Sequence, residues 1–505
     1  MGNCRLDRNS KMIVTHLFKE SRLHLESLRQ IIASVFLLTS LAGIAQELDL
    51  PDIGDSSAVA ITPAEERKLG EQLIRQLRRN LAFIDDPEVS EYLNNLGYRL
   101  VSQFDSPNQK FSFLLINDPS INAFALPGGY IVVHSGLIRK TVVESELAAV
   151  VGHEIAHVSQ RHIARAIERG NLSGLSTMAG VLAAMVLASQ NPELGQATLT
   201  AAIASSVQSQ INFTRTNEKE ADRVGIDLMA RAGFDPKSMP KFFERLHKAT
   251  RLYGEQPPEF LSTHPVTTSR MSDSYNRAEQ IKLDKPPTEY TSYLIIRAKL
   301  RVLTDEPSDS INYFRARLKE HLPAKNRAAS RYGLAMSYLK NNQPQNAKPI
   351  ISKLIKSDPN RLPYHSALAK IEMASNHPNK ALTVYQKALN MNPENHAITT
   401  YYTEALLNMG KADLATPILR NHIRRYRNAN PYLYELLARA EGKAGDLSAA
   451  HRAQAEFYYL SGQTFAAIEQ LKIAKKIESL SEFQKLRIEA RLKQLELIAM
   501  EEERS

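Results

Sequence analysis

The chain has 505 residues, a net charge of +10 at pH 7 and an ordinary hydrophobic fraction of 43%. This length exceeds what one hydrophobic core usually holds, so we expect two or more domains. Cys4 is the only cysteine, which excludes a fold held together by disulfides within the chain. The positive charge suits an anionic membrane surface or acidic partners, and without a base-reading motif it does not indicate a nucleic-acid-binding protein.

Residues 31–45 form an apolar stretch that follows Arg22 and Arg29 and ends in small residues. This is the pattern of a secretory signal peptide, with cleavage predicted after Ala45. An uncleaved membrane anchor is the alternative, although the stretch is shorter than the roughly 20 residues that a span needs.

Residues 122–133 contain Pro127, Gly128 and Gly129 between two apolar segments. Pro-Gly and Gly-Gly steps mark turns. The segment therefore predicts a structural hairpin, and with it a small sheet in a mostly helical domain.

His153, Glu154 and His157 belong to a segment, residues 144–157, whose small and apolar residues recur at helical spacing without a breaker. On a helix the two imidazoles are four residues apart, share one face and can bind one small cation. Glu154 then lies beside a water bound to that cation and can take its proton. HExxH on a helix is typical of zinc hydrolases, although five residues alone also match by chance.

Residues 174–188 form a second apolar run, rich in Ala and Gly. It is about five residues short of a membrane span. We expect a mobile lid or a buried helix near the active site, and residues 197–210 could cover the cleft.

A catalytic zinc needs a third protein ligand and one open position. Glu218 is the best downstream candidate, because Glu218 and Asp222 share a helix face at i, i+4 spacing, whereas Glu220 points to a different face. Glu218 would complete the coordination, and Asp222 would accept the free ring N–H of His153. The alternative is that this run of charges is only a solvated helix surface.

Past about residue 310, Ala347, Ala381, Ala415 and Ala449 recur at intervals of 34 positions. This interval is the length of the tetratricopeptide repeat. We expect each alanine to open the second helix of a pair, where a small residue lets two helices approach. Four or more pairs would stack into a curved solenoid with a concave face.

The motif HEIAH, followed about sixty residues later by NEKEADRVG, resembles the HExxH and ExxxD pattern of the HtpX and CAAX-prenyl-protease type of zinc metallopeptidase. The resemblance implies one Zn²⁺ per chain. It also implies that Glu218, the first residue of ExxxD, binds the zinc together with His153 and His157, while Glu154 is the catalytic base.

The segment ahead of the zinc helix resembles this family's edge strand. A peptide substrate would lie along it in extended form, held by main-chain hydrogen bonds. The residues implied in this role are Asn122, Ala123, Phe124 and Ala125.

His264 precedes Pro265, which predicts a loop or a helix start. From the residues alone, a loop histidine bonded to backbone is the plain interpretation. In the BepA/YfgC-like periplasmic subgroup that this chain resembles, the corresponding histidine can bind zinc as a fourth protein ligand and hold the enzyme latent. Arg270 would then stabilise the oxyanion or a nearby carboxylate. We expect His134 and His162 to be structural or exposed.

These features predict an α+β, mostly α protein with a signal peptide at 1–45, a Glu-zincin metalloprotease domain with a small sheet at 46–285, and an all-α tetratricopeptide solenoid at 286–505. The resemblance implies a periplasmic endopeptidase that degrades misassembled or stalled outer-membrane β-barrel proteins and aids their assembly. It implies repeats that dock on the barrel-assembly machinery, with peripheral membrane contact possible and no nucleic acid. The alternative function is a non-proteolytic chaperone or scaffold with a structural zinc.

Overall fold

The computed structural model describes residues 61–104, 109–170, 215–253, 259–283, 290–426, 430–478 and 480–503. All of them belong to one compact unit, residues 57–505. The predicted signal peptide at 1–45, the apolar run at 174–188 and the segment 197–210 lie outside the described residues. Among the helices that are described, none combines the length and the apolar character needed to cross a membrane.

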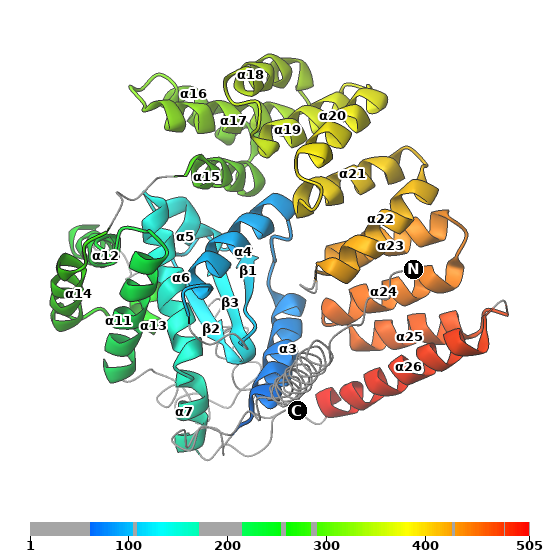
Figure 1. Ribbon diagram of the computed structural model, residues 1–505, viewed down its shortest axis with the longest axis horizontal. Helices are drawn as coiled ribbons and strands as arrows, with labels where there is room; N and C mark the ends of the chain where they lie inside the picture. Colours follow the sequence, from blue (N-terminus) through cyan, green and yellow to red (C-terminus); the bar gives the residue numbers. More distant parts are fainter. Residues whose placement is uncertain are drawn as a thin grey trace, which may run out of the picture. The chain divides into compact units, whose positions relative to one another are not determined.

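A three-stranded sheet forms the centre of the first half of the chain (Figure 1). β1 (Ser112–Ile116) pairs in parallel with β3 (Tyr130–His134), and β2 (Ala123–Leu126) pairs antiparallel with β3, giving the order β1-β3-β2. The turn Pro127–Gly129 joins β2 to β3, and both of its glycines adopt positive φ angles, 74° and 83°, which other residues rarely take. The predicted hairpin is therefore confirmed.

α6 (Glu144–Ser159) packs on the sheet, and α11 (Arg215–Arg231) packs closely on α6. Gly152 and Gly225 face each other where the helices meet. A Cβ atom added at Gly225 would lie only 3.1 Å from the backbone nitrogen of His153. Because neither glycine carries a side chain, the helices approach closely enough for their polar side chains to meet.

Further helices surround this pair and the sheet. Their bounds are α3 (Pro63–Asn80), α4 (Pro87–Val101), α5 (Ser135–Lys140), α7 (His162–Gly170), α12 (Ser238–Tyr253), α13 (Glu259–Thr263) and α14 (Thr268–Gln280). α4 packs on β1 and α6, and α14 packs on α11 and α12.

The second half of the chain consists of helices, each in contact with the next (Figure 1). Ala347, Ala381, Ala415 and Ala449 are buried in the first turn of α18, α20, α22 and α24, which confirms the predicted helical repeats. The bounds are α15 (Thr291–Thr304), α16 (Pro307–Arg317), α17 (Ala324–Lys340), α18 (Pro344–Ser357), α19 (Leu362–Ala374), α20 (Pro378–Met391), α21 (His396–Asn408), α22 (Ala412–Arg425), α23 (Pro431–Lys443), α24 (Leu447–Leu460), α25 (Thr464–Lys475) and α26 (Glu482–Glu503).

One hydrophobic core runs from the sheet into the first repeats. It includes Val89 of α4, Ile295 of α15 and Tyr332 of α17, all fully buried. The predicted domain boundary between residues 285 and 286 falls in 284–289, outside the described residues, and stays a prediction. Across this boundary the described elements pack as a continuous interior.

Buried charges also join the two halves. The ammonium group of Lys299 contacts the carboxylates of Asp86 and Glu88, and it donates a hydrogen bond of 2.9 Å to the hydroxyl of Tyr401. Asp86 caps α4 by accepting the backbone N–H of Val89 at 3.1 Å. The start of α4 is therefore fixed by a lysine of α15 and a tyrosine of α21.

Glu91 on α4 makes a second contact between the two halves. It is partly buried and accepts hydrogen bonds from Asn395 Nδ2 at 2.7 Å and from the backbone of Ala397 at 3.4 Å. Burial raises the pKa of Glu91 to about 7, and these hydrogen bonds only partly oppose the rise.

We predict that Glu91→Gln makes the protein more stable than wild type at pH 8 by about 1–3 kcal/mol, and much less so at pH 5. A carboxyl with a raised folded pKa contributes stability below its unfolded pKa, near 4.5, and loses it as pH rises through about 7. Urea midpoints at both pH values measure the difference. Glu394→Gln, at an exposed glutamate, is the control; a Glu91→Gln effect that is equal at pH 5 and pH 8 contradicts the prediction.

Candidate metal centre

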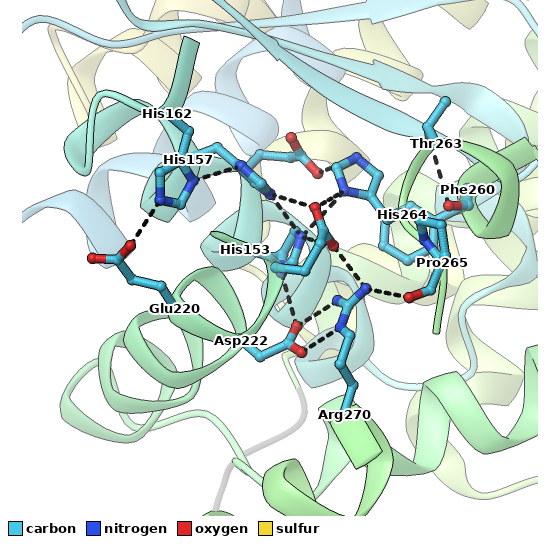
Figure 2. Close-up of polar contacts among 12 residues, drawn as sticks. His153, His157, His162, Glu220, Asp222, Phe260, Thr263, His264, Pro265 and Arg270 are labelled. Carbon is cyan, nitrogen blue, oxygen red and sulfur yellow. Dashed lines mark hydrogen bonds and ion pairs between the residues drawn. The ribbon is translucent and has the colours of Figure 1, made fainter. Parts of the chain in front are cut away.

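Four buried side chains each place one donor atom within 4.8 Å of the others: His153, His157, Glu218 and His264. The Nε2 atoms of His153 and His157 are 3.0 Å apart, and His157 Nε2 is 3.4 Å from Glu218 Oε1. His264 Nδ1 is 3.4 Å from His153 Nε2 and 3.1 Å from Glu218 Oε1. Figure 2 shows the three imidazoles turned toward one another.

This spacing fits one tetrahedral cation. Zinc bonds of about 2.0–2.1 Å at tetrahedral angles place neighbouring donors roughly 3.3–3.4 Å apart, close to the separations between these donors. Imidazole nitrogen and carboxylate oxygen are both zinc ligands. None of the four residues is more than 2% exposed, so bulk water does not solvate the donors. The residues present therefore fit a zinc ion.

Glu154 lies beside the donors without joining them. Both of its carboxylate oxygens are buried, and the backbone N–H of Ala125 in β2 lies against it. His264 Nε2 lies 3.6 Å from its Oε1 atom. Burial raises the pKa of Glu154, although the nearby His264 and His153 oppose the rise. A carboxylate in this position suits proton transfer to or from a small molecule at the centre.

Asp222 and Arg270 lie behind the donors. Asp222 Oδ1 is 3.0 Å from His153 Nδ1, on the side of the ring away from the other donors. Arg270 donates to both oxygens of Asp222, at 2.7 and 2.8 Å, and its Nη1 is 2.7 Å from Glu218 Oε2. The sequence left two roles open for Arg270, contact with the oxyanion or with a nearby carboxylate. In the structure its guanidinium contacts carboxylates.

The contacts perturb the ionisation of the donors in the metal-free centre. Although burial lowers it, hydrogen bonds to Asp222 and Glu218 raise the pKa of His153 to about 10. Burial holds the pKa of His157 well below its usual value. Burial also raises the pKa of Asp222, but hydrogen bonds from Arg270 and His153 more than offset this and leave it lowered. A cation at the centre would compete with the proton on His153.

His264 follows α13 directly. Its backbone N–H donates to the carbonyl of Phe260 at 2.8 Å, and its ring stacks on the Phe260 ring with centroids 5.0 Å apart. Pro265 next in the chain accepts a hydrogen bond from Arg270 at 2.9 Å. The same arginine therefore holds this turn and the carboxylates of α11.

The predicted substrate strand is β2, an outer strand of the sheet that packs on α6. Asn122, just before it, is buried; its carbonyl accepts the N–H of His134, and its side chain accepts the N–H of Ala123. Phe124 and Ala125 are partly buried. Among the described strands β2 pairs with β3 alone, so it is an edge strand of the kind along which a peptide strand can add.

Two contacts were missed by reasoning from the sequence. His162, expected to be structural or exposed, is fully buried, and its Nδ1 lies 2.9 Å from His157 Nδ1. Glu220 does point away from the four donors, as predicted, but its Oε2 is 3.1 Å from His162 Nε2. The spacing of five residues between His157 and His162 gave no helical signal, because the helix ends between them.

Known proteins match both halves of the chain. Residues 87–278 match Peptidase family M48, and residues 372–440 match the tetratricopeptide repeat. The chain is 36% identical to the beta-barrel assembly-enhancing protease of Escherichia coli strain K12, over 88% of this chain and 91% of that one. It is also 36% identical to the putative beta-barrel assembly-enhancing protease of Vibrio cholerae, over 90% and 94%. Mitochondrial metalloendopeptidase OMA1 of Arabidopsis thaliana is 36% identical over 31% of this chain and 29% of that protein.

The fold, the donor set and these matches define a metallopeptidase that carries a domain of helical repeats. More narrowly, the chain belongs to the beta-barrel assembly-enhancing proteases of peptidase family M48. It is therefore a metalloendopeptidase, and its family implies a metal at the centre. The repeats are of a kind that binds other proteins.

We predict that Arg270→Met lowers the stability of the metal-free protein by about 3–5 kcal/mol, because it leaves Asp222 and Glu218 buried without their cation. Added zinc should recover part of the loss by neutralising Glu218. Urea midpoints with EDTA and with zinc measure both effects. Arg223→Met, which removes an exposed ion pair between the same two helices, should change stability by less than about 1 kcal/mol. Equal midpoints for the two variants would contradict the prediction.

Proposed function

We propose that this metalloendopeptidase uses one zinc ion per chain to hydrolyse misassembled outer-membrane β-barrel proteins. The observation that supports this most directly is the convergence of His153, His157 and Glu218 on one buried point, with Glu154 beside it. The names of the relatives support the substrate class, since they are described as proteases that enhance β-barrel assembly.

Each residue has a distinct part in the proposed chemistry. Zinc, when bound by His153, His157 and Glu218, supplies a Lewis acid that polarises a peptide carbonyl and acidifies water. Glu154 takes the proton of the attacking water and passes it to the leaving amine. Asp222 accepts the Nδ1–H of His153 and keeps the other ring nitrogen turned to the centre.

The substrate would bind as an extended strand along the edge strand β2. Misassembled barrels expose unpaired strand edges, which need main-chain partners of this kind.

We propose that the protein is exported to the periplasm after cleavage near Ala45, and that its repeats dock on the barrel-assembly machinery. Peripheral contact with the membrane is compatible with the net positive charge.

We further propose that His264 holds the enzyme latent. Its Nδ1 is 3.4 Å from His153 Nε2 and 3.1 Å from Glu218 Oε1, close to the separation expected between two ligands of one zinc ion. With His264 bound, four protein ligands would fill the coordination sphere. No position would then remain for a water molecule. Movement of His264 away from His153 and Glu218 would open the site.

The same geometry gives the alternative its strongest support. If His264 never leaves, a site with four protein ligands is a structural zinc site, and the chain is a chaperone or scaffold. Glu154 favours the protease, because a purely structural site has no use for a buried carboxylate that lies beside the donors without being one of them. In cells, a scaffold would keep its function with Glu154→Gln, whereas a protease would lose it.

We predict that Glu154→Gln keeps one zinc per chain but hydrolyses casein with a kcat/KM at least about 100-fold below that of His264→Ala, since the amide cannot accept the proton. His264→Ala should also keep zinc and should hydrolyse casein faster than wild type. Zinc content by atomic absorption and peptide release from casein measure both. Zinc in all three proteins without any hydrolysis would favour the scaffold, and an inactive His264→Ala would contradict the latent state.

A further inference from the structure

His162 lies next to the second motif histidine although the helix has already ended. α6 ends at Ser159, and α7 begins at His162. Between them Arg161 adopts a φ of 50°, a left-handed conformation that residues with a side chain rarely take. The reversal turns His162 back, so that its ring centroid is 4.9 Å from that of His157.

The strained turn is held in place by contacts from a distant helix. The guanidinium of Arg161 donates to Glu66 Oε1 at 2.8 Å and to the carbonyl of Ile61 at 2.7 Å. Strained backbone persists where the surrounding structure specifies it, and it is concentrated at functional sites. The position of His162 is therefore a specified feature of the fold.

His157, His162 and Glu220 form a row of two hydrogen bonds. Each hydrogen bond needs one donor and one acceptor, and this requirement decides which ring nitrogens carry protons. His157 turns its Nε2 toward His153 and Glu218, so Nε2 must be free of a proton to bind a cation, and Nδ1 carries the hydrogen. His157 Nδ1–H then donates to His162 Nδ1 across 2.9 Å. His162 in turn carries its hydrogen on Nε2 and donates it to Glu220 Oε2 across 3.1 Å.

We propose that His162 and Glu220 are positioning residues that fix the tautomer and the ring orientation of His157 for metal binding. The inference rests on the proposed binding of zinc by His157. Figure 2 shows the row of contacts from Glu220 through His162 to His157, beside the separate contact of Asp222 with His153. The two motif histidines are thus oriented by two carboxylates of the same helix, α11.

The helical periodicity of α11 explains why Asp222 contacts His153 directly, whereas Glu220 reaches His157 only through the imidazole of His162. Residues on a helix are separated by about 100°, so Glu220 points roughly 200° away from both Glu218 and Asp222. Its carboxylate cannot reach the donors from that direction. The imidazole of His162, buried between them, spans the gap, while Glu220 remains 36% exposed at the protein surface.

The test compares zinc affinity, by competition with a chromophoric chelator, for wild type, His162→Phe, Glu220→Ala and the double variant. We expect His162→Phe to weaken zinc binding by about 10- to 100-fold, which is the usual effect of losing such a partner. Glu220→Ala should weaken it less, and the double variant should be no weaker than His162→Phe, because both residues act through one row. Asp273→Asn, which breaks the exposed ion pair between Asp273 of α14 and Arg223 of α11, should leave affinity unchanged.

The protonated nitrogen of His157 gives a second readout. In zinc-loaded protein with ¹⁵N-labelled histidine, wild type should show His157 protonated at Nδ1 with a hydrogen-bonded proton signal, and His162→Phe should lose that signal. Glu220→Ala lies at the surface end of the row, so it remains informative if His162→Phe does not fold. If both single variants bind zinc as tightly as wild type, or if their losses of affinity add in the double variant, this inference is overturned but the proposed function is not. A wild-type protein that binds no zinc would overturn the proposed function as well.

Discussion

The close approach of α6 and α11 is the constraint on which the candidate centre depends. Gly152 and Gly225 leave room for the backbones to come together beside His153. At that distance, side chains of ordinary length from one helix meet those of the other at about 3 Å. A methyl group at Gly225 would press on the backbone of His153, which carries one of the four donors. The two glycines are therefore as important to the geometry as the ligands.

The buried carboxylates of Glu218 and Asp222 are tolerable because each has a cationic or hydrogen-bonding partner. Glu218 and Asp222 share Arg270, and Asp222 also faces His153. With Glu154 ionised and the imidazoles neutral, these groups sum to a net charge of −2, which a divalent cation would balance. The same logic applies at the contact between the two halves of the chain, where Lys299 meets two carboxylates of α4.

The repeats are more than an appended binding module. The core under the sheet continues into α15 and α17, and at the far end of the solenoid Glu502 of α26 contacts Arg75 of α3 at 3.1 Å. α4 likewise packs on α15 and α21 of the second half. α4 also packs on α6, the helix that carries His153, Glu154 and His157.

The sequence by itself determined the elements whose signal is local. HEIAH shows helical spacing within five residues, the Pro-Gly-Gly turn marks its hairpin, and the period of 34 marks the repeats, so each was predicted without any long-range contact. Glu218 and Asp222 were also predicted, because residues at i and i+4 share one helix face, as the two histidines of the motif do. Only the tertiary structure decided which groups surround them: the meeting of α6 with α11, and the contact of Arg270 with carboxylates. The pairing of His162 with Glu220 was likewise invisible, since it depends on a left-handed turn at Arg161 held by residues about a hundred positions away. Helical periodicity can be recognised from residues close together in the sequence, whereas contacts between helices depend on how the whole chain packs.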